Sequence, residues 1–150
     1  RRIPTFHLLA IVSTDPAYAA QAQAIRALAV RLHVSHFIRF LRPVSRELLP
    51  YYLSAADCVI IPSLSEGFGL NVAEACAVRR VVVASNVDSI PEVISGRYIL
   101  FDVGNPSALA DAVVQAHHGK IMNETLRRFP FHDTIQNYLN IYTRLLSHAR

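Results

Sequence analysis

Two glutamates and two glycines lie close together in the middle of the chain, where they could bind a polar ligand. Glu66 precedes Gly67 and Gly69, and Glu74 follows the second glycine by a little more than one helical turn. Glycine lets the backbone approach a ligand closely, and a helix that begins after such a loop offers free N–H groups to a phosphate. Carboxylates accept hydrogen bonds from sugar hydroxyls. The segment therefore indicates a site for a ligand that carries phosphate and hydroxyl groups.

The same segment also has a purely structural interpretation. In it, Gly67 and Gly69 are turn residues, Phe68 fills the core, and Glu74 is a surface residue of a helix. Glycine pairs of this kind are common in turns, so the spacing alone does not choose between the two interpretations.

Short apolar runs alternate with amphipathic stretches from one end of the sequence to the other. We expect strands at residues 6–12, 37–41, 58–62, 81–85 and 98–101. We expect helices at residues 17–32, 45–56, 69–78, 90–94, 105–118 and 133–148. Strands separated by helices require right-handed crossovers, which give a parallel sheet with helices on both faces. The sequence thus predicts a Rossmann-like α/β fold, as a single domain over residues 1–150.

The predicted sheet places the glycines and glutamates at its ligand-binding edge. In an open parallel sheet, ligands bind beyond the carboxyl ends of the strands. The loop after strand 58–62 carries Glu66 and both glycines, so it opens at that edge. The run 81–85, of which the first four residues are apolar, is typical of a strand buried on both faces. In the last helix, apolar residues from Ile135 to Leu146 recur at helical intervals, which favours core packing over a groove for a partner.

Composition excludes several classes of protein. Apolar residues make up 52% of the 150 residues and charged residues 17%, which excludes a disordered chain. The sequence contains no run of 18 uncharged apolar residues, so it predicts no transmembrane helix. The net charge of +4 comes mostly from scattered arginines, which suits an anionic small ligand or a membrane surface at least as well as nucleic acid, so charge alone does not decide. No nucleic-acid partner is expected. The chain starts without Met, which suggests a piece of a longer protein.

Cysteine and histidine spacing favours neither a disulfide framework nor a metal site. Cys58 and Cys76 lie in apolar surroundings, as reduced thiols of a cytoplasmic protein do. The histidines lack Cys or carboxylate companions at ligand spacing, so we expect no metal.

Further segments extend the pattern well beyond the glycines. They are residues 51–52, 55–57, 59–63, 82–85, 89–93, 100–102, 105–106 and 109–110. Together with Glu66 to Leu70 and Glu74-Ala75, they resemble the C-terminal half of GT-B glycosyltransferases, and within these the retaining family 4 group. The resemblance covers the chain from about Phe37 onward.

This resemblance implies a specific reaction and specific residues. The group transfers a sugar from a nucleoside diphosphate to an acceptor hydroxyl with retention, here as a hexosyltransferase. Glu74 would bind the donor ribose, and Glu66 would hold the donor sugar and, as the candidate catalytic residue, stabilise its cationic form. The substrate-binding residues it implies are Glu66, Gly67, Phe68, Gly69, Leu70 and Glu74. The nucleotide sugar is a substrate, and no cofactor is expected.

The resemblance also implies partners and a location. The acceptor site belongs to an N-terminal domain that is not in this chain, so the isolated chain is expected to be inactive. Members build polysaccharides or glycoconjugates on acceptors that are often lipid-linked. A cytoplasmic protein that associates peripherally with the inner face of the membrane is compatible with this.

Several departures from the family pattern leave alternatives open. Arg79 replaces a family glycine, Arg42-Pro43 stands where another glycine is usual, and Asp88-Ser89 replaces a glycine pair. A non-catalytic GT-B-like domain that acts as an interaction or regulatory subunit is therefore the alternative, and a free-standing nucleotide-binding regulator is a third. Because Arg79 precedes strand 81–85, we expect it at the opposite edge from the ligand, with positive φ after a helix.

Overall fold

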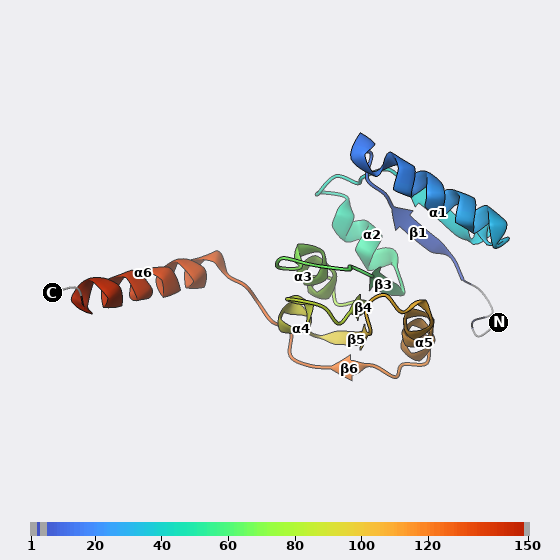
Figure 1. Ribbon diagram of the computed structural model, residues 1–150. Coiled ribbons are helices and arrows are strands. Elements are labelled where there is room, and N and C mark those ends of the chain that lie inside the picture. The colour runs from blue at the N-terminus through green and yellow to red at the C-terminus, as the bar shows by residue number, and fades with distance from the viewer. Residues whose placement is uncertain (1–2, 4–5, 149–150) are drawn as a thin grey trace.

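The computed structural model describes residue 3 and residues 6–148, and it shows an α/β fold (Figure 1). The strands are β1 (Leu8–Ile11), β2 (Ile38–Leu41), β3 (Cys58–Ile61), β4 (Val81–Ser85), β5 (Arg97–Phe101) and β6 (Met122–Asn123). The α-helices are α1 (Ala19–Arg31), α2 (Leu49–Ala55), α3 (Leu70–Ala77), α4 (Ile90–Val93), α5 (Pro106–His117) and α6 (Phe131–His148). Short 3-10 helices, η1 (Pro16–Tyr18) and η2 (Ser35–Phe37), precede α1 and β2. Every strand and helix expected from the sequence is present.

The strands form two sheets within the described residues, which corrects the expectation of one continuous parallel sheet. Strands β1 and β2 pair in parallel with each other, and β3, β4 and β5 pair in parallel in a second sheet. Strand β6 was not predicted, and it pairs antiparallel with β5 through only two exposed residues. So short and exposed a strand leaves no hydrophobic alternation in the sequence.

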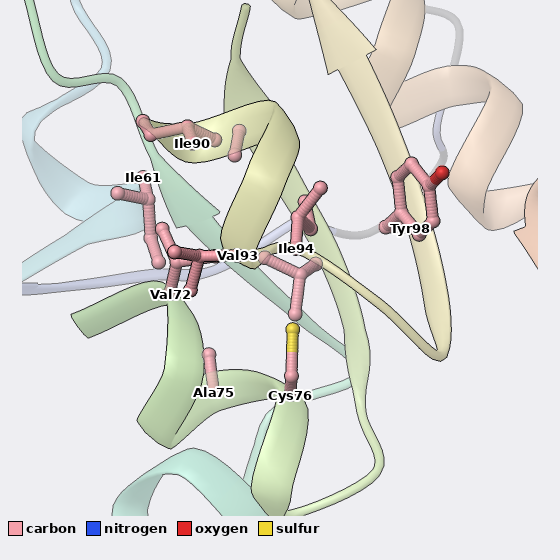
Figure 2. Packing of buried hydrophobic residues seen from close by; sticks show 10 residues of the cluster. Ile61, Val72, Ala75, Cys76, Ile90, Val93, Ile94 and Tyr98 are labelled. Carbon is pink, nitrogen blue, oxygen red and sulfur yellow. The ribbon is translucent and has the colours of Figure 1, made fainter. Parts of the chain in front are cut away.

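Strand β4 lies at the centre of the larger sheet, between β3 and β5. All five of its residues are buried, including the polar Ser85, as predicted for the run 81–85. On one face, Val72 of α3, Ile90 of α4 and Ile94, which directly follows α4, pack on it (Figure 2). On the other face, Val83 packs in a smaller cluster that includes Ala112 of α5. A fully buried Val or Ile side chain stabilises the fold by about 1.5–3 kcal/mol, so this sheet is a firm base for its loops.

Helix starts follow local chemistry where the chain offers a cap. The Asn105 side chain accepts a hydrogen bond from the Ala108 N–H at 3.0 Å and caps α5, with Pro106 as the first helical residue. Helix α2 begins at Leu49 and not at Ser45, because residues 46–48 form a turn and Pro50 lies in the first helical turn.

Helix α6 extends away from the rest of the chain (Figure 1). Its apolar residues are exposed, for example Tyr138 at 57%, Leu145 at 64% and Leu146 at 71%. The expectation that this helix packs into the core is therefore wrong for the described residues. Helical periodicity shows that one face is apolar, but it does not show what covers that face.

Candidate functional site

The glycine loop, residues 62–69, leaves the carboxyl end of β3 and leads directly into α3. Gly69 is buried and has φ of +91°, the left-handed region that L side chains rarely adopt. A Cβ built on it would also lie 3.6 Å from the Glu66 Cγ. Glycine is thus required by the backbone conformation, and its lack of a side chain leaves room above the start of α3.

Glu66 is half-buried and lies over Gly69. Its carboxylate Oε2 accepts a hydrogen bond from the Ser63 hydroxyl at 3.3 Å. That bond uses one of about four acceptor positions on the carboxylate. Glu66 therefore retains acceptor capacity for ligand hydroxyls next to the glycine backbone.

Glu74 lies on the exposed side of α3, one turn beyond the helix start. The buried residues Val72, Ala75 and Cys76 fix the opposite side of this helix to the core. No hydrogen bond or ion pair involves the Glu74 carboxylate in the part of the chain that the structure describes. Glu74 is thus a surface residue of the helix, as the structural interpretation predicted. Its carboxylate is also accessible to a ligand, as the binding interpretation requires.

Phe68 and Leu70 are exposed at the same loop, at 43% and 62%. The interpretation of Phe68 as a core residue is therefore wrong. Its ring instead meets the ring of Phe129 edge to face, with centroids 5.3 Å apart.

Two neighbouring segments hold the glycine loop, and the sequence analysis did not find them. At the end of β4, the fully buried Ser85 donates a hydrogen bond to the Ser63 carbonyl oxygen at 2.6 Å. In the following loop, Asp88 accepts hydrogen bonds from the Glu66 N–H and the Ser65 hydroxyl, at 2.9 and 2.8 Å. These bonds hold the pKa of Asp88 below its usual value, with the Glu66 N–H as the larger cause. The replacement of a family glycine pair by Asp88-Ser89 was the available signal.

Arg79 lies at the edge of the sheet opposite the glycine loop. It follows α3, has φ of 58°, and donates its N–H to the Cys76 carbonyl oxygen at 2.9 Å. Since β3 and β4 run parallel, the start of β4 is remote from the end of β3. The expected position and conformation of Arg79 are both confirmed, so it neither blocks the glycine loop nor adds a cation to it.

Most residues of the glycine loop are exposed, among them Leu64 at 75%. Cavities of about 240 and 340 Å³ lie beside β1, and residues of the glycine loop line neither of them. Within the described ranges, no group of three His, Cys, Asp or Glu side chains could hold a metal ion. No described helix is both long and apolar enough to cross a membrane.

Both cysteines are free thiols. Burial raises the pKa of the Cys58 thiol to about 11, and burial also raises the pKa of Cys76. Both thiols therefore stay protonated near neutral pH, as structural core residues do.

Curated relatives align over much of the chain. The O-antigen chain mannosyltransferase B of Escherichia coli is 39% identical over 80 residues, which are 53% of this chain and 21% of that protein. The D-inositol 3-phosphate glycosyltransferase of Nocardioides sp. is 33% identical and covers 75% of this chain and 27% of that protein. The chain thus spans about a quarter of the length of these relatives.

Solved structures share the fold. Sucrose-phosphate synthase from Thermosynechococcus elongatus superposes with a TM-score of 0.74 at 24% identity, over 98% of this chain and 40% of that one. Anabaena HepE in complex with UDP gives a TM-score of 0.71 at 20% identity, over 79% of this chain and 33% of that one. These are GT-B glycosyltransferases, and the fold of this chain matches theirs. The model of the glycosyl transferases group 1 family matches residues 3–118, and the chain belongs to that family.

Proposed function

We propose that this chain is the donor-binding half of a retaining glycosyltransferase, which takes a hexose from a nucleoside diphosphate sugar. The observation that carries the proposal is the glycine loop. It places a left-handed, buried Gly69 at the start of α3, with the side chain of Glu66 packed next to it through its Cγ. A diphosphate fits beside main-chain N–H groups of this kind, and the sugar hydroxyls fit the carboxylate.

Each residue has a role in this proposal. Glu74 accepts hydrogen bonds from the ribose hydroxyls, and the amides near Gly67 and Gly69 face the diphosphate. Negative charge grows on the diphosphate as it leaves, and N–H donors already in place stabilise it. Glu66 holds the sugar and stabilises its cationic form during transfer. The anomeric configuration is retained.

The relatives support a nucleotide-sugar donor and a role in polysaccharide or glycoconjugate synthesis. HepE was solved with UDP, and the Escherichia coli relative is an O-antigen chain mannosyltransferase. We therefore propose that this chain binds a nucleoside diphosphate and that the whole protein transfers the sugar to an acceptor within a growing glycan. Because acceptors of this kind are often lipid-linked, we propose that the protein is cytoplasmic and contacts the inner face of the membrane peripherally.

We propose that an N-terminal domain outside these residues carries the acceptor site and completes the donor site. The exposure of the glycine loop, with Phe68 at 43% and Leu70 at 62%, is compatible with a second domain beside it. The exposed apolar residues of α6, including Tyr138, Leu145 and Leu146, also favour a further covering surface, because a stable protein rarely leaves a large apolar patch uncovered.

The alternative of a non-catalytic domain relied on Arg79 and on the missing glycines. Arg79 lies at the edge opposite the glycine loop, so it does not favour this alternative. The sequence features at the loop itself, Glu66 and both glycines, are intact.

Calorimetric titration of the intact protein with UDP and with GDP tests the proposal. Glu74→Ala removes the ribose contact and should weaken binding by about 1.5–3 kcal/mol, the range for a hydrogen bond to a charged group. Glu92→Ala removes an exposed carboxylate from α4 and serves as the matched control. Equal affinity of wild type and Glu74→Ala would contradict the ribose assignment. Absence of binding to either nucleotide would contradict the proposed function itself.

A further inference from the structure

The loop between β4 and α4, residues 86–89, holds the main chain of Glu66 from both sides. The Asp88 carboxylate accepts the Glu66 N–H at 2.9 Å, and the Ser89 hydroxyl donates to the Glu66 carbonyl oxygen at 3.2 Å. The same Asp88 oxygen, Oδ2, also accepts the Ser65 hydroxyl at 2.8 Å. Both polar groups of the Glu66 main chain are thus bonded to residues 22 and 23 positions further along the chain.

Asp88 adopts an unfavourable backbone conformation to make these bonds. Its φ is 46°, in the left-handed region that side chains other than glycine enter at a cost. His33 and Arg79 share this feature, with φ of 55° and 58°, but both follow the end of an α-helix, where such residues are common. Neither of their side chains makes a hydrogen bond within the described residues. Asp88 precedes a helix, and its side chain makes two, so its contacts with the glycine loop compensate for the strain.

The bonds from Asp88 and Ser89 restrict the position of the Glu66 side chain. With its N–H and its carbonyl group both bonded, the Glu66 main chain cannot rotate freely, so the side chain leaves the backbone in a fixed direction, next to Gly69. The bond from the Ser63 hydroxyl adds a further constraint on the carboxylate itself. A group that must meet a ligand in a fixed geometry gains from being held before the ligand arrives.

We propose that Asp88 is a positioning residue, whose carboxylate holds the Glu66 peptide so that the glycine loop is preformed for the donor. This inference rests on the proposed function, because it names what the ordered loop is for. Asp88 does not itself need to touch the donor.

Charge provides a way to test this proposal. Asp88 is ionised at neutral pH, so its negative charge, in addition to that of Glu66, repels a bound diphosphate. On charge alone, removal of Asp88 should therefore strengthen nucleotide binding. If Asp88 acts by holding the loop, its removal should instead weaken binding. The two effects have opposite signs.

The variants are Asp88→Gly and Asp88→Asn, made in the intact protein. Glycine relieves the backbone strain but has no acceptor. Asparagine tolerates the left-handed conformation, and its single carbonyl oxygen can replace Oδ2, which accepts both hydrogen bonds. Arg79→Gly is the matched control, because it also replaces a left-handed residue with glycine but lies at the opposite edge of the sheet.

The first measurement needs no nucleotide. Amide hydrogen exchange at Glu66 should be about tenfold faster in Asp88→Gly than in the wild type, because the protecting acceptor is gone. Exchange in Asp88→Asn and in Arg79→Gly should match the wild type. Unchanged exchange in Asp88→Gly would overturn the proposal.

The second measurement is the affinity for UDP and for GDP, with the midpoint of thermal unfolding recorded on the same samples. Asp88→Gly should bind about tenfold more weakly at an unchanged midpoint, and Asp88→Asn should bind at least as tightly as the wild type. Faster exchange with unchanged or tighter nucleotide binding in Asp88→Gly would overturn the positioning role. A wild type that binds neither nucleotide would overturn the proposed function, a result distinct from the exchange data.

Discussion

The ring of Phe68 in the glycine loop meets the ring of Phe129 at an interplanar angle of 85°, with centroids 5.3 Å apart. Phe129 belongs to the segment between β6 and α6. Hydrogen bonds hold this segment next to α4. There the Arg127 N–H donates to the Ser95 hydroxyl oxygen at 3.0 Å, and the Arg127 guanidinium donates to main-chain oxygens of Pro91 and Glu92. The segment that leads to α6 is thus in direct contact with the glycine loop.

This contact predicts an energetic coupling between the two rings. Edge-to-face aromatic pairs contribute about 0.5–1.5 kcal/mol beyond the area they bury. In a double-mutant cycle of Phe68→Ala and Phe129→Ala, the free energies of unfolding should differ from additivity by this amount. Urea denaturation of the four proteins measures it. The exposed Phe131, paired with Phe68 in a second cycle, should show no coupling.

Arg79→Gly should be neutral or stabilising. The left-handed conformation costs a residue with a side chain about 1–2 kcal/mol, and glycine avoids it. Part of this gain is lost because glycine makes the unfolded chain more flexible. Thermal unfolding measures the change, and nucleotide affinity should stay the same. A large change in affinity at constant stability would place Arg79 in the site and restore the non-catalytic alternative.

Ser85→Ala should destabilise the protein by about 1–3 kcal/mol. Ser85 is fully buried, and its loss leaves the Ser63 carbonyl oxygen without this donor. Ser107→Ala, at an exposed position in the first turn of α5, is the control and should have little effect. Equal stability of Ser85→Ala and wild type would show that the hydrogen bond between β4 and the glycine loop contributes nothing.

Alkylation of Cys58 should be slow at pH 8 and should accelerate up to about pH 11. Its pKa is raised to about 11 by burial, so roughly one thiol in a thousand is ionised at pH 8. The stability that comes from keeping this thiol neutral is present below about pH 8.5 and is lost as the pH rises through 11. Iodoacetamide labelling with peptide mass spectrometry gives the profile. In the urea-unfolded control the rate should be half-maximal near pH 8.5–9, the ordinary thiol pKa. The same half-maximal pH in the folded protein would contradict the prediction.

The chain by itself should show no sugar transfer. In the proposed function the acceptor site lies on another domain, and residues 1–150 retain only the donor side. Assay of the purified chain with nucleotide sugars and glycan acceptors tests this. Transfer by the isolated chain would mean that the acceptor site is formed by these residues.

The sequence determined the local elements and the place of the candidate site. Strand β4 is an apolar run, Asn105 and Pro106 are strong helix starters, and the glycines stand where a strand gives way to a helix. Such signals act over a few residues, so periodicity and capping chemistry are enough to read them. The left-handed Arg79 was also predictable, because the end of a helix sets that conformation.

Only the tertiary structure decided the long-range relationships. The separation of β1 and β2 from the larger sheet, the antiparallel β6 and the uncovered face of α6 depend on which surfaces meet. The contacts of Asp88 with Glu66 and of Phe129 with Phe68 join residues 22 and 61 positions apart. An amphipathic pattern in the sequence shows which face of a helix is apolar. A departure from a family pattern, such as Asp88, shows which position is unusual. Neither names the partner, because that choice is made by packing across the whole molecule.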